Sequence, residues 1–589
     1  MNLIQQLNTE VSAVLTSLYN IPSSTIIFQE TNPQFAGDVT LVVFPYLKVS
    51  GQNPELTANT IGTALMGSTQ LVQEFNVVKG FLNFVIKHEC WLQYFNTSQS
   101  QPLALPSTGK TIMVEYSSPN TNKPLHLGHV RNNLLGVSVS NILAAAGHKV
   151  VKVNIINDRG VHICKSMLAY QLFGNNETPE SAGIKGDHLV GKYYVEFDKH
   201  YKVELKTLVA NGVAEADAPK QSQLMAQVND MLRKWEANDT TVKQLWQTMN
   251  SWVYAGFDVT YKKLGVTFDK IYYESNTYLL GKEIVAEGLA KNIFYTKPDG
   301  STWIDLTADK LDEKVVLRAD GTSVYITQDL GTAVARANEF AIDGMIYTVG
   351  NEQDYHFKVL FKTLEKLGYS WATNMHHLSY GMVELPEGKM KSREGTVVDA
   401  DELIQEMYNS AKQTTEELGK VDGFTTDELH HLYHQISMGA LKYFMLKVDP
   451  KKTMLFNPKE SIDFQGNTGP FIQYTHARIH SILHKANYTA DLIKHYTLPQ
   501  LHLRELSVIK QLYAYSAVLQ EAANTYSPAL IAHFVYDLAK LYNQLYNECP
   551  IIKEENEQIK EFRLALSYRV STVIANALGV LGVEAPQRM

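Results

Sequence analysis

The strongest constraint on the fold is a strand, a turn, a helix and a second strand that follow one another between residues 111 and 156. "TIMVEYSS" and "KVVKVNII" are short runs rich in β-branched residues, as strands are. Between them, "HVRNNLLGVSVSNILAAAG" places apolar residues at helical spacing, with Gly147 as the predicted C-cap. A helical connection of this length favours a βαβ unit and a parallel sheet buried on both faces. We therefore predict an α/β fold with a Rossmann-like parallel sheet.

A chain of 589 residues is too long for a single core, so several domains are expected. Residues 1–105 predict a small N-terminal α/β domain, which ends in a linker rich in Ser, Gln and Pro. Residues 106–400 predict the parallel-sheet domain, with a polar, helical insertion at about 180–290. Residues 401–465 predict a linking helical segment, and residues 466–589 an α-helical bundle.

Three further strand-like runs follow the insertion. They are "KVVLR" (314–318), "SVYIT" (323–327) and "GMIYTVG" (344–350), and a helix is expected after each of the last two. After about residue 400 the pattern is helical throughout, so no strand is predicted there.

Composition limits the class of protein. Hydrophobic residues make up 45% and charged residues 19%, with a net charge of -8, which describes an ordinary globular chain without a global sign of nucleic-acid binding. A local basic patch stays possible. Cys90, Cys164 and Cys549 show no CxxC spacing, so we expect no structural zinc, no disulfide framework and a reducing cytoplasm. Without a signal sequence or a long apolar run, a cytoplasmic protein with no membrane contact is expected.

The turn of the βαβ unit carries "NTNKPLHLGHVRNNLLG", residues 121–137, with two histidines three positions apart. A helix N-terminus at this place offers unpaired N–H groups to phosphate. Gly128 would let a purine lie flat against the backbone, while His126 and His129 could both donate to a triphosphate during attack on phosphorus. Taken alone, the pair could equally be surface histidines. A metal pair is a further alternative, although no HExxH glutamate accompanies it.

A second motif far along the chain favours the nucleotide hypothesis. "EGKMKSREGTVV", residues 387–398, places Lys389, Lys391 and Arg393 in a glycine-flanked loop that could hold leaving phosphates. Alone it would be a solvated basic loop. The two motifs together, in this order, predict a site for a nucleoside triphosphate.

These motifs resemble those of a known family. HLGH is similar to the HIGH motif, and KMKSR to the KMSKS loop, of class I aminoacyl-tRNA synthetases; "VEYSSPNTNKPLHLGHVRN" resembles the arginyl-tRNA synthetase motif. "FAGDVT" and "GFLNF" resemble that family's N-terminal tRNA-binding domain, and "GNTGPFIQYTHARIHSI" and "LGVEAPQRM" its anticodon-binding domain. The resemblance implies an AMP-forming ligase that activates L-arginine with ATP and transfers it to the 3′-terminal adenosine of tRNA(Arg). Activation would require bound tRNA.

The resemblance also implies site residues. The predicted catalytic residues are Lys123, His126, His129, Lys389, Lys391 and Ser392. The predicted ATP-binding residues are Pro124, His126, Gly128, His129, His356, Met390 and Lys391. Ser392 stands where the common KMSKS form has its second lysine, and similar synthetases without that lysine often carry one just before HIGH, where this chain has Lys123.

Recognition of a guanidinium requires carboxylates and planar acceptors, because the group is planar and permanently charged. The positions that match the family's arginine pocket are Glu115, Asn120, Tyr325, Asp329 and Gln353. Each has a structural alternative taken singly: a helix-start carboxylate, a strand core residue or a loop cap. Their coincidence in pattern and order favours a binding role.

Between residues 474 and 510, five Lys or Arg stand against two acidic residues, with histidines and tyrosines interleaved. Basic residues beside aromatic faces suit unstacked anticodon bases, so Tyr474, Arg478 and Lys485 are predicted to bind tRNA. A solvated helix face is the alternative. Magnesium is expected to arrive with ATP rather than in a protein-built metal site, and a monomer is expected.

Rival hypotheses make different demands on the sequence. A cysteine-specific synthetase would need zinc ligands, which three scattered cysteines do not supply. A catalytically silent tRNA-binding paralogue would be expected to have lost the histidines or the basic loop. A small nucleotidyltransferase with a HIGH-type motif would lack the helical third.

Overall fold

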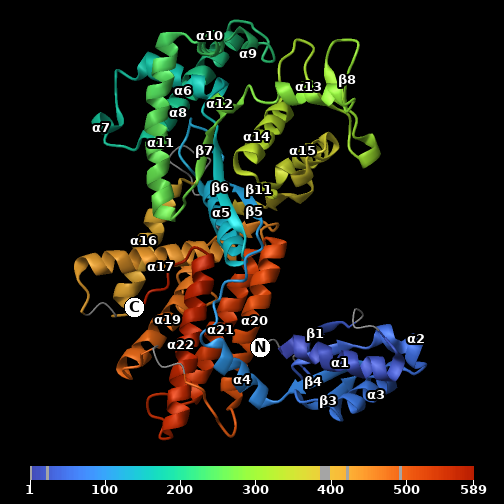
Figure 1. Ribbon diagram of the computed structural model, residues 1–589. Helices are drawn as coiled ribbons and strands as arrows, with labels where there is room; N and C mark the ends of the chain where they lie inside the picture. Colours follow the sequence, from blue (N-terminus) through green and yellow to red (C-terminus); the bar gives the residue numbers. More distant parts are fainter. Residues whose placement is uncertain (1–2, 22–25, 33, 385–397, 420–422, 490–493) are drawn as a thin grey trace.

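The computed structural model describes residues 3–21, 26–32, 34–384, 398–419, 423–489 and 494–589. Figure 1 shows an N-terminal α/β unit, a central parallel sheet flanked by helices, and a helical bundle on the opposite side of the sheet from the insertion helices. The predicted fold class is confirmed.

The N-terminal unit is an antiparallel sheet of four strands, in the order β1-β2-β4-β3, covered by two helices. Its main elements are α1 (Leu3–Tyr19), β1 (Phe28–Glu30), β2 (Val39–Val42), α2 (Leu47–Ser50), α3 (Pro54–Met66), β3 (Val72–Val78) and β4 (Phe81–Ile86). Lys79 and Gly80 join β3 to β4, both with positive φ (49° and 81°), as a two-residue hairpin turn requires. A Cβ at Gly80 would lie 2.4 Å from Pro54 Cβ, so the glycine lets the hairpin contact the start of α3.

Helix α4 (His88–Ser98) leaves this unit and packs on the C-terminal bundle. The rings of Trp91 and Tyr94 lie edge-on to that of Tyr513 in α20 (Leu503–Thr525), with centroids 5.5 and 4.9 Å apart. Edge-to-face contacts of this kind add to the burial of apolar area, so α4 attaches the N-terminal unit to the bundle.

The central sheet has five parallel strands in the order β12-β11-β5-β6-β7. They are β5 (Thr111–Glu115), β6 (Lys149–Ile156), β7 (Lys270–Tyr273), β11 (Gly344–Gly350) and β12 (Met375–Tyr380). From β5 the chain continues to β6 on one side and returns much later to β11 on the other. The carboxyl ends of β5 and β11 therefore border the topological switch point, where open α/β sheets bind ligands.

Alternate residues of the strands face different helices. Val114 and Ile346 belong to the core on the side of α5 (Leu127–Ala145), whereas Met113 and Met345 belong to the core of α14 (Tyr325–Phe340) and α15 (Asp354–Leu367). A sheet covered on both faces gives the near-continuous apolar runs from which these strands were predicted.

The predicted insertion is helical, but one sheet strand lies inside its range. Between β6 and β7 the longest helices are α6 (Val161–Phe173), α8 (Gly186–Ala210), α10 (Gln223–Glu236) and α11 (Thr240–Leu264). After the edge strand β7 come α12 (Glu274–Thr277), α13 (Lys282–Ala290), β8 (Phe294–Thr296), β9 (Thr302–Ile304) and β10 (Lys314–Leu317). The last three form a separate antiparallel sheet, which contains the predicted strand "KVVLR".

Two sequence predictions of strand structure are wrong. "SVYIT" is not a strand: α14 begins at Tyr325, and Thr327 Oγ1 accepts the backbone N–H of Val324 (3.2 Å), which starts a helix in spite of the β-branched residues. A two-residue strand, β14 (Met454–Leu455), also exists after residue 400, where it pairs in parallel with β13 (Val383–Glu384).

The remaining chain is helical. Its helices are α16 (Ala400–Glu417), α17 (Thr426–Leu446), α18 (Pro458–Ser461), α19 (Gly469–Lys485), α20, α21 (Pro528–Glu548) and α22 (Glu557–Val580). The bundle contacts α5 as well: Ser138 Oγ on α5 donates to the carbonyl of Val580 (3.1 Å). The sheet and the bundle thus share one helix, whose N-terminus faces the switch point.

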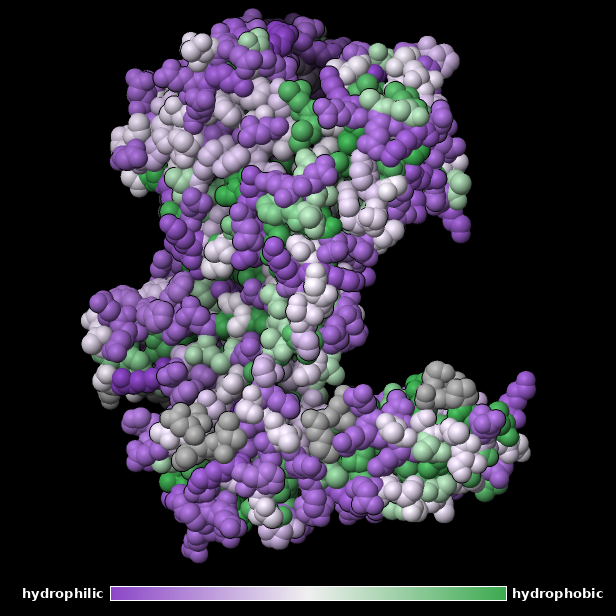
Figure 2. Space-filling model, viewed as in Figure 1, coloured by the Kyte–Doolittle hydropathy of each residue, from purple (hydrophilic) through white to green (hydrophobic). Residues whose placement is uncertain are grey.

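The surface is mainly hydrophilic, with small apolar patches (Figure 2). The same view is hollowed on one side, between the N-terminal unit and the sheet domain. Among the described residues, no helix is both long and apolar enough to span a bilayer.

Candidate active site

The HLGH turn forms the N-terminus of α5. His126 is the N-cap residue and His129 lies in the first turn, with the ring centroids 3.8 Å apart. The backbone N–H of His126 donates to Nδ1 of His129 (3.2 Å), so a neutral His129 carries its proton on Nε2. The helix N-terminus and this imidazole together offer donors to an anion.

Both histidines are held in the neutral form. Burial, helped by the charge of Lys123, lowers the pKa of His126 to about 4. Burial, His126 and Lys123 lower the pKa of His129 well below its ordinary value. Burial also lowers the pKa of Lys123. At neutral pH the two imidazoles are therefore uncharged hydrogen-bond donors beside a partly desolvated ammonium group.

Two glycines allow close packing at this turn. A Cβ at Gly128 would lie 3.2 Å from Cε1 of His126, so a side chain there would displace the imidazole. A Cβ at Gly191 of α8 would lie 2.9 Å from Cδ of Pro124, so the insertion helix touches the residues just before HLGH. Both contacts fix the position of the turn.

The basic motif lies mostly outside the described residues. Lys389, Met390, Lys391 and Ser392 fall within 385–397. The residues that follow are beside the HLGH turn: the N–H of Leu127 donates to the carbonyl of Val398 (2.9 Å), and that of Ala400 to the carbonyl of Leu125 (3.0 Å). The chain therefore emerges from the basic motif directly at the N-terminus of α5.

Four of the predicted arginine-binding residues lie near the carboxyl ends of the strands. Tyr325, 80% exposed, and Asp329 lie in the first turns of α14, and Gln353 follows β11. Nε2 of His356 on α15 lies 2.6 Å from a carboxylate oxygen of Asp329. Asn120 forms a bridge to Asn157, just beyond β6. The arrangement leaves the Asp329 carboxylate 46% exposed, and therefore accessible to a ligand.

Glu115 has a partner that the sequence did not reveal. Its carboxylate forms a buried ion pair with Arg336 of α14, and the Arg336 guanidinium lies 4.6 Å from the ring centroid of Tyr272. Burial opposes the charge of Arg336, but Glu115 raises its pKa. Arg336 thus compensates the Glu115 carboxylate, and a direct contact of Glu115 with arginine stays a prediction. The signal was an arginine within the apolar helix run "GTAVAR".

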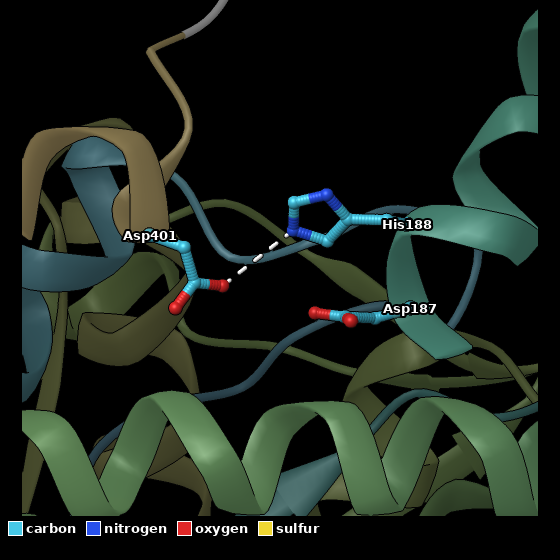
Figure 3. A group of neighbouring side chains, drawn as sticks. All are labelled: Asp187, His188 and Asp401. Atoms are coloured by element: carbon cyan, nitrogen blue, oxygen red, sulfur yellow. Dashed lines mark ion pairs between the residues drawn. The ribbon is translucent and has the colours of Figure 1, made fainter. Parts of the chain in front are cut away.

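One described group of side chains has the geometry to hold a metal ion: Asp187, His188 and Asp401 (Figure 3). Nζ of Lys185 bonds the Asp401 carboxylate and lies 3.2 Å from Asp187, and Nζ of Lys263 lies 3.0 Å from Asp401. Burial opposes ionisation of Asp401, but His188 and the lysines hold the pKa of its carboxyl well below its usual range. The group therefore joins α8, α11 and α16, and the ammonium groups of Lys185 and Lys263 neutralise the carboxylates in place of a metal ion.

The three predicted tRNA-binding residues line one groove of about 620 Å³ in the bundle. Tyr474, Arg478 and Lys485 come from α19, and Tyr546 and the C-terminal Met589 complete the walls. The Arg478 guanidinium lies between two rings, 4.8 Å from the centroid of Tyr474 and 5.3 Å from that of Tyr546. A cationic, aromatic groove of this kind can stack an unpaired base.

Comparison with known families agrees with this geometry. Residues 96–457 match the family described as tRNA synthetases class I (R), catalytic domain, and residues 472–589 match the DALR anticodon binding domain. The parallel sheet and the HLGH turn are thus those of a class I tRNA synthetase.

Relatives specify the branch of this class. The chain is 56% identical to the arginine–tRNA ligase of Bacteroides thetaiotaomicron over 583 residues, 98% of each chain. It is 54% identical to that of Phocaeicola vulgatus over 606 aligned positions, 100% of each. The chain belongs to the arginyl-tRNA synthetase family.

Solved structures show the same fold at low sequence identity. The arginyl-tRNA synthetase of Thermus thermophilus matches with a TM-score of 0.79 and 23% identity, over 99% of this chain and 100% of that one. The enzyme from Plasmodium falciparum matches with a TM-score of 0.80 and 18% identity over the whole of both chains.

Proposed function

We propose that this protein is an arginine–tRNA ligase that activates L-arginine with ATP and transfers it to tRNA(Arg). The observation that carries the proposal is the neutral histidine pair at the N-terminus of α5, beside the sheet's switch point. The arginine carboxylate attacks the α-phosphorus of ATP, which gives arginyl-adenylate and pyrophosphate. The 3′-terminal adenosine of the tRNA then attacks the acyl carbon and releases AMP.

The proposed division of labour at the nucleotide follows from charge. The Nε2–H group of His129, with His126, donates to phosphate oxygens whose negative charge grows during attack, and Lys123 adds a positive charge from the same turn. Lys389 and Lys391 bind the leaving pyrophosphate. Pro124, Gly128, His356 and Met390 border the nucleoside. Magnesium enters with ATP as part of the substrate, and we propose no resident zinc.

The proposed arginine pocket is built on α14. Asp329 accepts the guanidinium, with Tyr325 beside it on the same helix face one turn away. Asn120, Gln353 and Glu115 take the polar groups at the other end of the amino acid, with the Glu115 carboxylate held in place by its ion pair with Arg336. His356 orients Asp329 by holding one of its oxygens. Such a carboxylate selects a guanidinium over an apolar side chain, because a guanidinium can donate to both oxygens.

Transfer RNA is proposed to contact both ends of the chain, with residues 1–105 as a tRNA-binding domain and residues 466–589 as the anticodon-binding domain. The groove of Tyr474, Arg478 and Lys485 suits an unstacked anticodon base. Catalysis falls to residues 106–400, with 401–465 as the link. We further propose a cytoplasmic monomer whose activation step requires bound tRNA.

The test of this function is ATP–pyrophosphate exchange, measured with each of the twenty amino acids and with or without tRNA(Arg). Of the twenty amino acids we expect only arginine to support exchange, because the pocket presents a carboxylate to the side chain. We expect this exchange only when tRNA is present. Exchange with another amino acid, or with none, would overturn the proposal. Exchange with arginine in the absence of tRNA would remove only the tRNA requirement.

Removal of the Arg478 guanidinium should weaken tRNA binding. We expect Arg478→Met to raise the KM for tRNA(Arg) about 10-fold in aminoacylation, because one stacked base contributes roughly 1–3 kcal/mol. The KM values for ATP and arginine should stay unchanged. Lys206→Met, which removes an exposed charge from the insertion helix α8, is the matched control. Equal effects of the two variants would argue against a base-binding groove.

A further inference from the structure

Arg131 lies two residues after His129, on the same helix, and its side chain is completely buried. Among the described residues its hydrogen-bond partners are four backbone carbonyl oxygens. Nη1 donates to Gly381 (2.6 Å) and Met382 (3.0 Å), and Nη2 to Pro450 (3.3 Å) and Lys452 (2.9 Å). Burial lowers the pKa of Arg131, against a smaller opposing effect of Tyr380 and Asp449.

Burying a guanidinium against these carbonyls has a high desolvation free energy, which packing alone does not require. Hydrogen bonds offset the desolvation of the charge, and no carboxylate in the described parts of the chain forms an ion pair with it. An apolar side chain would fill the same space at lower cost. The role of Arg131 should therefore lie in the chain segments to which its four carbonyl partners belong.

The carbonyls belong to two chain segments that meet in front of α5. Gly381 and Met382 directly precede β13, and Pro450 and Lys452 precede β14. The two backbones are in contact: the N–H of Gly381 donates to the carbonyl of Pro450 (2.9 Å), and a Cβ at Gly381 would lie 2.7 Å from the carbonyl carbon of Lys452. Arg131 joins both segments to the helix of the histidine pair.

These contacts complete a two-ended attachment. Glu384, at the end of β13, is the last described residue before 385–397, and Val398 is the first after it. The far end is held by the bonds of 398–400 to Leu125 and Leu127 at the start of α5. The near end is held, through β13, by Arg131. The chain on either side of the basic motif is thus attached at the start of the same helix, α5.

We infer that Arg131 is a positioning residue for adenylate formation, which fixes the start of β13 relative to His126 and His129 without touching a substrate. The inference deepens the proposed function and rests on it. Arginine suits this role because the two terminal nitrogens of its planar guanidinium bond different segments at the same time. A lysine has a single terminal nitrogen, so it would keep the charge and lose the bridge.

The test compares Arg131→Lys with the parent protein in ATP–pyrophosphate exchange, at saturating tRNA, per mole of folded protein. We expect kcat to fall roughly 10- to 100-fold, because displacing catalytic groups by about 1 Å lowers a reaction rate by this order of magnitude. The KM for ATP should rise several-fold. The KM for arginine should change less than about 2-fold, since the pocket on α14 is not attached to these carbonyls.

Arg569→Lys is the matched control. Arg569 is also nearly buried, its pKa is also lowered by burial, and Nη2 donates to a backbone carbonyl, that of Gln101 (3.3 Å). It lies on α22, away from the histidines. We expect a lower midpoint of thermal unfolding with unchanged kinetic constants. A merely structural Arg131 would behave in the same way, and that result would overturn the inference.

A second variant perturbs the same junction from the other side. Gly381→Ala forces a Cβ against the backbone at Lys452 and leaves α5 intact, so it should reproduce the ATP-selective defect. It also serves as the test if Arg131→Lys does not fold. Normal kcat and KM for ATP in the folded Gly381→Ala protein would contradict the inference. Failure of the parent protein to exchange with arginine would instead refute the proposed function.

Discussion

Replacing Asp329 by asparagine should raise the KM for arginine by roughly 30- to 1,000-fold and leave the KM for ATP nearly unchanged. The carboxylate is the acidic group in the first turns of α14, one turn after Tyr325, and His356 of α15 is bonded to one of its oxygens. Loss of one charge from a pair that substrate binding would desolvate costs about 2–4 kcal/mol. The asparagine keeps the shape and one acceptor, so the change isolates the charge.

The control for this variant lies on the same helix. Glu339→Gln removes a carboxylate that bonds Lys270 and Tyr272 on the outer side of β7, and it should leave both KM values unchanged. Canavanine, which keeps a guanidinium-like group, should compete with arginine, whereas lysine should not. Unaltered arginine kinetics in Asp329→Asn, or an equal change in Glu339→Gln, would exclude Asp329 from the pocket.

Local patterns predicted the parts of the fold whose reasons are local. The β5–α5–β6 unit follows from two short β-branched runs around one helical period. Because βαβ connections have one handedness and place the helix start at the carboxyl ends of the strands, the position of His126 and His129 at those ends was predictable as well. The strand prediction for "SVYIT" was wrong because the capping bond that the N–H of Val324 donates to Thr327 Oγ1, and the helical residues that follow, outweigh the β propensity of the run.

The interactions that assemble the site were not predictable in this way. Arg131 bonds backbone carbonyls 250 to 321 positions away in sequence. Because every residue has a backbone carbonyl, the sequence does not indicate which of them an arginine will bond. Arg336 and Glu115 are 221 positions apart, on a helix and a strand that pack only after the sheet has formed. A charged residue within an apolar helix run signals such a partner but does not identify it. The two-residue strand β14 is too short to have any period.

Substitution of Lys123 should have the largest effect on the chemical step. The lysine is half-buried, burial lowers its pKa, and its charge lowers the pKa of both His126 and His129, so its ammonium group lies near both imidazoles. Its attraction to the triphosphate grows as the oxygens gain charge in the transition state. Lys123→Ala should therefore lower kcat for adenylate formation by about 10²–10³-fold, with little change in the KM for arginine.

A rescue experiment tests why this lysine carries so much of the work. Ser392 stands where the common KMSKS form has a lysine, so Ser392→Lys added to Lys123→Ala should restore part of the rate by returning a charge to the phosphates from the second motif. Lys110→Ala, which removes an exposed lysine at the opposite end of β5, should be neutral in the same assay. A nearly silent Lys123→Ala, or a double variant no faster than the single one, would show that the two positions do not share a role. Lys123 would then be a half-buried residue that precedes the HLGH turn without acting on ATP.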